Sequence, residues 1–269
     1  MTASAQMTMT IPFRSSLLRL LLSAIAFLVL AVSTTGCDSG GASEPEDEPA
    51  TAQARFLHAS AGAGTLTVVA DGDEIVSGLS FRRDFADPSI TDYKEGVPVD
   101  APIEVRNASG TVLASVNAGR LEADAQYTVV VAGSGADGDE APQAVVLRDD
   151  RPELGSNEVG LRLVHGAVAA SSIDLFQVPS GDSIRAENRI ASDIAFAGTV
   201  PASPTGSFSV RTVPDSGFAW TVPTSAGPVQ FPVGIPGQAS LSPGRHATAV
   251  ILDTEEGAGF PVAGTVQVD

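Results

Sequence analysis

After Thr51, short apolar segments alternate with clusters of glycine, proline, aspartate and serine. Segments of this length, rich in valine, leucine and isoleucine, predict strands and turns, and so an all-β protein. The strands predicted in the first half are Ala54–Ala59, Thr65–Ala70, Ile103–Arg106, Val112–Val116, Tyr127–Ala132 and Ala144–Arg148. Their spacing of roughly ten residues is typical of a β-sandwich. Leu121–Ala125 is expected to form at most one helical turn.

The second half of the chain repeats the pattern of the first. Four pairs of segments correspond in the same order: Arg55–Ala59 with Arg162–Gly166, Thr65–Val69 with Ser172–Phe176, Ile103–Arg106 with Phe208–Arg211, and Tyr127–Val131 with His246–Val250. A period of about 107 residues is the size of a domain, so we predict two tandem sandwiches. The second half is richer in proline, which predicts edge strands and long loops there.

The first 36 residues have the organisation of a signal peptide. Arg14 and Arg19 form a basic flank, and the apolar run Leu20–Val32 follows them. As a helix this run would be roughly 20 Å long, too short for a hydrocarbon core of about 30 Å. Small residues then lead to Gly36, after which we predict cleavage.

Cys37 is the only cysteine of the chain. A lone thiol outside the cell cannot form an internal disulfide and would be exposed to oxidation. Its position directly after small residues resembles a bacterial lipobox, although Thr34 stands where a leucine is usual, and we predict lipidation of Cys37. The alternative is an ordinary cleaved signal peptide with an incidental cysteine.

An acidic segment, Asp38–Ala50, separates Cys37 from the first predicted strand. It has five acids and no aromatic residue, so we expect a disordered stalk. The predicted organisation is a signal peptide over 1–36, a lipidated linker over 37–51, a first sandwich over 52–150, a linker over 151–158 and a second sandwich over 159–269.

The charge balance is strongly acidic, with 32 acidic against 15 basic residues and a net charge of −17. This argues against nucleic acid as a partner, because its phosphates would be repelled. Lys94 is the only lysine. An acid excess with almost no lysine resembles proteins of salt-loving organisms; a generic acidic surface is the alternative.

The Arg-x-x-His-Ala-Ser opening at Arg55–Ser60, the alternating strand after it and the Asp71-Gly72 turn resemble a bacterial family, the domain of unknown function 4397. The family's Val-Asp-Val-Tyr strand has its counterpart in Ile173–Phe176. The resemblance implies immunoglobulin-like β-sandwiches, often in tandem in secreted or lipid-anchored proteins. It implies no catalytic motif.

Three histidines and the carboxylates of two acidic turns are the candidates for catalysis or metal binding. His58 and His165 hold equivalent positions in the two halves, so we expect each to hydrogen-bond a loop backbone and not to share a site. His246 aligns with Tyr127, which suggests a packing position. The Ala-Asp-Gly-Asp-Glu turns at Ala70–Glu74 and Ala136–Glu140 offer carboxylates to calcium, but Asp-Gly is also a preferred hairpin turn, which we favour.

Motifs for other chemistry are lacking in the sequence. It has no Gly-x-Ser-x-Gly elbow, and Gly133–Gly138 lacks the lysine and helix of a phosphate loop. Trp220 is either a core residue, which we favour, or a stacking platform for carbohydrate. We therefore predict no catalytic residue, no metal site and no cofactor.

The function predicted from these observations is display at the cell envelope. Lipid on Cys37 would fix the protein to the membrane, on the outer membrane or cell surface rather than the inner membrane, and loops would meet an extracellular protein or glycan partner in a structural or adhesion role. Two alternatives stay open: an extracellular glycan- or peptide-binding module, and an envelope hydrolase with a dispersed active site.

Overall fold

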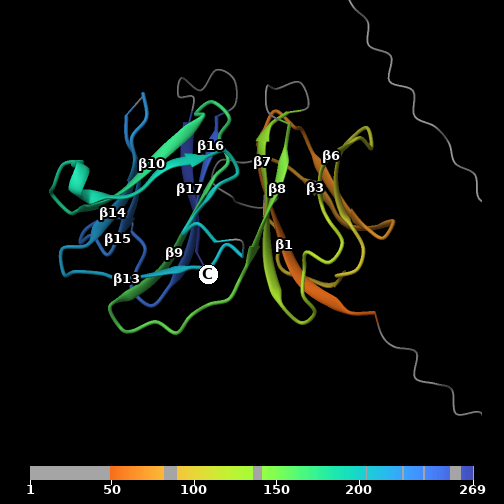
Figure 1. Cartoon of the computed structure of the whole chain (residues 1–269), viewed down its shortest axis with the longest axis horizontal. Coiled ribbons are helices and arrows are strands. Elements are labelled where there is room, and N and C mark those ends of the chain that lie inside the picture. The colour runs from red at the N-terminus through yellow and green to blue at the C-terminus, as the bar shows by residue number, and fades with distance from the viewer. Residues whose placement is uncertain are drawn as a thin grey trace, which may run out of the picture. The chain divides into compact units, whose positions relative to one another are not determined.

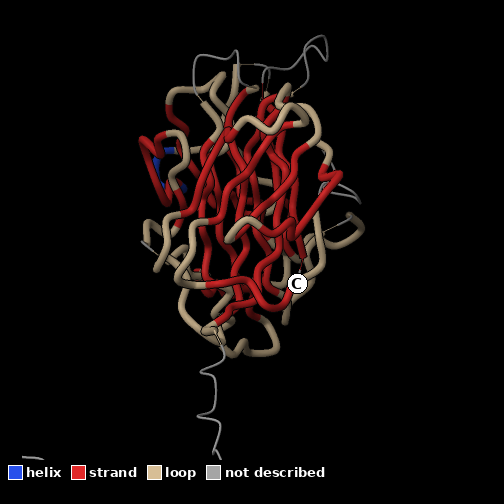
Figure 2. Tube along the Cα trace, turned by 90° about the vertical axis from the view of Figure 1, so that its right-hand side faces the viewer, coloured by secondary structure: helices blue, strands red, loops and turns tan. Residues whose placement is uncertain are grey.

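The computed structural model describes residues 49–81, 90–135, 141–203, 205–225, 227–238, 240–254 and 262–268. This part of the chain is nearly all strand, with one short 3₁₀ helix, η1 (Ala186–Asn188). No helix within it is long and apolar enough to cross a membrane. The predicted all-β fold is therefore confirmed. Figure 2 shows the strands lying roughly along one common axis, with loops at both ends.

The first half of the folded chain forms two four-stranded sheets. Its strands are β1 (Thr51–Ala61), β2 (Leu66–Ala70), β3 (Asp73–Leu79), β4 (Lys94–Pro98), β5 (Ile103–Asn107), β6 (Val112–Val116), β7 (Gln126–Ser134) and β8 (Gln143–Arg148). One sheet has the order β4-β1-β7-β8 and the other β3-β2-β5-β6. Phe56, Leu66 and Val129 are among the residues of the core between them.

All six strands predicted in this half are present. One expectation at their borders was wrong. Thr51, assigned to the linker, already pairs with Pro98 in β1, because the antiparallel ladder with β4 extends to it. Leu121–Ala125, expected to form at most one helical turn, forms a single turn without a helix, in which Ala125 N donates to Glu122 O at 3.4 Å.

The second half forms two further sheets. Its strands are β9 (Glu158–His165), β10 (Ser172–Pro179), β11 (Arg189–Ala195), β12 (Thr199–Val200), β13 (Ser209–Thr212), β14 (Phe218–Val222), β15 (Val229–Val233), β16 (His246–Asp253) and β17 (Val262–Val268). The sheets have the orders β12-β9-β16-β17, with β13 also paired to β9, and β11-β10-β14-β15. Trp220, Leu163 and Leu175 belong to the core between them. Pro232 lies in β15, an edge strand as its proline predicts.

The two halves share one strand order, drawn as two groups in Figure 1. In each, the first strand pairs in parallel with the long strand near its end: β1 with β7, and β9 with β16. The neighbours of these pairs also correspond strand for strand. Glu158, assigned to the linker, starts β9 by pairing with Thr212.

Two of the predicted correspondences between the halves were wrong in detail. Arg55 pairs with Thr128 and Arg162 with Thr248, so Tyr127 corresponds to Ala247, and His246 is shifted by one residue. A shift of one residue in a strand moves a side chain to the opposite face.

Phe208–Arg211 does not correspond to Ile103–Arg106 either. β13 pairs antiparallel with β9 as β4 pairs with β1, whereas β5 has its counterpart in β14. Both segments are short strands that contain a Val-Arg pair, so their sequences look alike. Only the strand with which each one pairs shows that they hold different places in the fold.

The sheet containing β1 and β7 packs its outer face against the sheet containing β9 and β16. A third apolar cluster fills this contact, formed by Leu57, Ala59, Val130, Ala132, Leu147, Val164, Val250 and Leu252. A backbone bond from Gly133 N to Gly166 O, 3.1 Å long, also crosses it. These four strands are thus buried on both faces, and the described residues form four sheet layers, two in each of two sandwiches that pack together.

Candidate functional site

Arg162 lies at the contact between the sandwiches and is almost fully buried. Its place in β9 turns it away from the core residues Leu161 and Leu163, and its side chain is 1% exposed. Its guanidinium pairs with the carboxylate of Asp149 and donates to Thr248 Oγ1 at 2.8 Å. The same group donates to the carbonyls of Arg148 (3.0 Å) and Gly206 (3.2 Å). The buried cation is therefore paired and surrounded by acceptors, as burial of a charge requires.

Asp149 links this arginine to the first sandwich. Its side chain has no exposed surface, and it accepts bonds from Thr128 Oγ1 (2.7 Å) and Tyr93 Oη (2.6 Å). Burial, together with the bond to Asp149, raises the pKa of Tyr93 well above its usual range, so the phenol stays protonated and donates. The cluster offers no activated nucleophile, and its geometry suits a joint between the sandwiches.

Arg55, the counterpart of Arg162, is anchored differently. Its Nε donates to Thr128 Oγ1 at 2.9 Å, and its guanidinium lies 5.0 Å from the centre of the Tyr93 ring. Both arginines thus converge on this joint, which sequence reasoning missed. The signal was available in two features: the arginine repeated in both halves, and the uninterrupted apolar runs of β7 and β16, since strands buried on both faces lose their alternation.

His58 and His165 each hold a loop beside their strand. His58 Nε2 bonds Gly64 O at 2.7 Å, and its Nδ1 accepts from Ser60 N at 3.3 Å. His165 Nε2 bonds Ala170 O at 2.9 Å. Burial lowers the pKa of His58 to about 4 and that of His165 below its usual value. The expectation of backbone-bonding histidines is confirmed, and each lies on the inner face of its own sandwich.

Asp253 is the carboxylate that acts electrostatically on His165. Its two oxygens accept from Val168 N (2.8 Å) and Ala169 N (3.0 Å), and burial raises its pKa. Asp253 therefore clamps the loop after β9, with no hydrogen bond to the imidazole in the described structure. This arrangement is a loop anchor and lacks the base–orienter bond of a hydrolytic site.

The first acidic turn is a hairpin. Asp71 and Gly72 have φ values of 50° and 86° and join β2 to β3 as a two-residue loop, the preference expected for Asp-Gly. The second turn, Ala136–Glu140, lies outside the described residues, as do Gly36 and Cys37. Across the described ranges, no group of three or more His, Cys, Asp or Glu could hold a metal ion.

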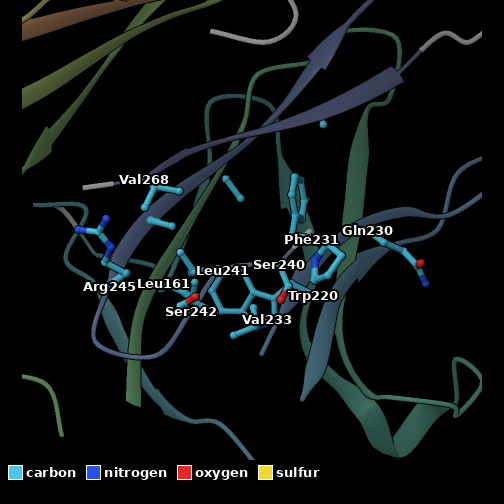
Figure 3. A pocket seen from close by; sticks show the side chains of 14 residues that line it. Leu161, Trp220, Gln230, Phe231, Val233, Ser240, Leu241, Ser242, Arg245 and Val268 are labelled. Atoms are coloured by element: carbon cyan, nitrogen blue, oxygen red, sulfur yellow. The ribbon is translucent and has the colours of Figure 1, made fainter. Parts of the chain in front are cut away.

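Trp220 is a core residue with 1% of its surface exposed, so its ring is no exposed platform for carbohydrate. It does line a pocket of about 540 Å³ between the two sheets of the second sandwich (Figure 3). Phe231, Val233 and Leu241 line the same pocket, with Arg245 and Ser242 as polar neighbours. The lining is largely apolar, and the size of the pocket suits a small molecule.

The fold places this chain among all-β proteins built of β-sandwiches. Residues 52–176 match the model of the family described as "Domain of unknown function (DUF4397)", so this part of the chain belongs to that family. The match begins at the second residue of β1, covers the rest of the first sandwich and continues through β9 into β10.

Other comparisons add little. No curated protein matches the sequence significantly. A solved structure, "The Bacillus anthracis TIE protein", is 8% identical, with 81% of this chain and 44% of that chain covered and a TM-score of 0.21. The chain thus spans less than half of that protein, and a TM-score this low does not define a shared fold.

Proposed function

We propose that this chain is a non-enzymatic, lipid-anchored protein of the cell envelope that displays two joined β-sandwiches as one rigid body. The observation that supports this most is the buried contact between the sandwiches. Leu57, Val130 and Val250 are fully buried there, and the Arg162–Asp149 pair lies beside them. A contact that buries apolar side chains and a paired charge opposes independent motion of the two sandwiches.

A rigid body of this kind suits presentation at a distance from a membrane. Its outer sheets and end loops stay available to an extracellular protein or glycan in a structural or adhesion role, as loops on rigid scaffolds commonly are. In this proposal the acidic segment after Cys37 is the tether, and acyl chains on Cys37 hold the protein in the outer membrane or at the cell surface.

Acylation of Cys37 is the part of the proposal to test first. Cells expressing the wild type, Cys37→Ala or the neighbouring control Ser39→Ala are labelled with a palmitate analogue and fractionated. We expect label and membrane retention for the wild type and the control, and neither for Cys37→Ala. Membrane retention of an unlabelled wild type would overturn the anchor.

Display is tested on intact cells. We expect externally added protease to cleave the stalk and release a folded fragment that contains both sandwiches. Protection of the protein until the cells are lysed would contradict surface display while leaving the anchor intact.

A further inference from the structure

The two sandwiches differ in how they fill the same region of their cores. Tyr127 in β7 corresponds to Ala247 in β16, because the register of each parallel pair is fixed by Arg55–Thr128 and Arg162–Thr248. On the facing sheets, Ile103 corresponds to Trp220, since they pair with the equivalent residues Ala70 and Gln177. The first sandwich therefore has Tyr and Ile where the second has Ala and Trp.

A pocket of the second sandwich lies at the place of this exchange. Tyr127 is 4% exposed, lies in its own core and accepts a bond from Glu122 N at 2.9 Å through its hydroxyl. Ala247 supplies only a methyl group at that place and lines the pocket of about 540 Å³. Interiors are normally packed to the density of organic crystals, so a pocket of this size beside Ala247 departs from ordinary core packing.

The indole N–H of Trp220 is a polar group left unsatisfied beside this pocket. Trp220 is 1% exposed, and its Nε1 donates to no atom of the described structure. Buried donors almost always have a partner, and an unpartnered one lowers stability. The lining of the pocket therefore leaves this donor unsatisfied in the described structure.

The polar edge of the pocket carries positive charge. Arg245 is exposed there and has no ion pair within the described residues, although the chain has 32 acids against 15 bases. The described lining includes two serines, Ser240 and Ser242, and no carboxylate. An apolar interior beside a guanidinium that has no ion pair among the described residues is complementary to a molecule with an apolar body and an anionic head.

We propose that the second sandwich binds a small amphiphilic carboxylate in this pocket, its apolar body against Trp220, Phe231 and Leu241 and its carboxylate at Arg245. This goes beyond the proposed display function and does not depend on it. The lining is visible in Figure 3, where Arg245 and Val268 lie toward one side and Phe231 and Trp220 toward the other.

Trp220 is the only tryptophan of the chain, so its emission reports on this pocket directly. The full chain carrying Cys37→Ala, which has no acyl group to compete, is titrated with decanoate, with uncharged decanol and with acetate. We expect a saturable change in emission with decanoate, binding about tenfold weaker with decanol, and none with acetate. An absence of saturable change with decanoate, or equal affinity for decanol, would overturn the proposal.

Variants separate the pocket from general surface binding. Ala247→Tyr places the residue of the first sandwich in the pocket and should abolish decanoate binding, with circular dichroism confirming the fold. Arg245→Gln should weaken binding about tenfold, and Arg185→Gln, a remote exposed arginine, should not change it. If Ala247→Tyr does not fold, Ala247→Val should still weaken binding severalfold; unchanged binding in either folded variant contradicts the site.

Discussion

The two sandwiches share a strand order and differ in what fills and joins them. The first is closed by Tyr127, whose hydroxyl bonds the turn at Glu122, whereas the second carries Ala247 and a cavity at that place. At the joint the two buried arginines have different partners: Arg162 of the second sandwich pairs with Asp149, and Arg55 of the first bonds Thr128 and lies over the ring of Tyr93. One fold thus accommodates a tyrosine at this core position in one copy and an alanine beside a pocket in the other, because the ladders of backbone bonds fix the topology independently of any single side chain.

The largest expected effect is at the joint. Asp149→Ala leaves the guanidinium of Arg162 buried without its carboxylate, so we expect a loss of about 3–5 kcal/mol in the free energy of unfolding, measured by urea denaturation. Asp150→Ala is the matched control, because Asp150 is exposed and pairs only with Arg148, and exposed pairs contribute little. Equal effects of both substitutions would show that the buried pair does not hold the joint.

Removing the ring of Tyr127 from the first core should lower the free energy of unfolding by nearly as much. Tyr127→Ala removes a buried ring and the acceptor of Glu122 N, and we expect a loss of about 3 kcal/mol in urea denaturation. Tyr127→Phe removes only the hydroxyl and should cost about 1 kcal/mol. A loss below about 1 kcal/mol for Tyr127→Ala would mean that the tyrosine ring adds little to the stability of the first sandwich, and that the Tyr–Ala difference between the two cores has no energetic weight.

The contact between the sandwiches predicts a somewhat smaller effect. Leu57 faces away from the core of its own sandwich, yet it is 0% exposed because the second sandwich covers it. We expect Leu57→Ala to lower the free energy of unfolding by about 2–4 kcal/mol. Val112→Ala, at a valine that is 46% exposed, should change it by less than about 0.5 kcal/mol. A neutral Leu57→Ala would mean that the sandwiches are not packed together in solution.

Acidification should destabilise the first sandwich through His58. Its pKa is about 4 when folded and 6.5 when unfolded, so the unfolded chain binds the extra proton between these values. The contribution of His58 is therefore complete above pH 6.5 and is lost as the pH falls towards 4, by roughly 3 kcal/mol. His58→Gln should reduce the fall in the free energy of unfolding between pH 7 and 4.5, measured by urea denaturation, and the part that remains includes His165, whose pKa is also lowered; an unchanged slope would contradict the neutral, buried state of His58. The pKa of Asp253 is raised by folding, so protonation of Asp253 stabilises the folded state as the pH falls, and it does so equally in the wild type and in His58→Gln.

The smallest effect concerns the hairpin at Asp71-Gly72. Gly72 has φ of +86°, and the space that a Cβ would enter there is open, so Gly72→Ala adds backbone strain alone, about 1 kcal/mol. Thermal unfolding should show this drop, and added calcium should leave the midpoint of the wild type unchanged. A rise of the thermal unfolding midpoint on addition of calcium would instead indicate that the carboxylates of Asp71–Glu74 bind the ion.

The sequence alone determined the fold class, six of the eight strands of the first half and the roles of His58 and His165; it missed β3 and β4. These features can be read from neighbouring residues. Glycine, proline and aspartate between apolar runs mark the strands, and each histidine stands at a strand end next to a loop of small residues. It also indicated two copies, but it misplaced Phe208–Arg211 and shifted His246 by one residue. Residue types repeat too loosely to fix a register that ladder pairing sets.

Only the tertiary structure decided that the outer faces of two sheets bury each other, that Arg162 and Asp149 meet, and that a cavity lies beside Trp220. The physical reason is common to all three. Each depends on which strand lies opposite which, and on whether the facing side chains together fill the space, as Tyr127 does in one sandwich and Ala247 does not in the other.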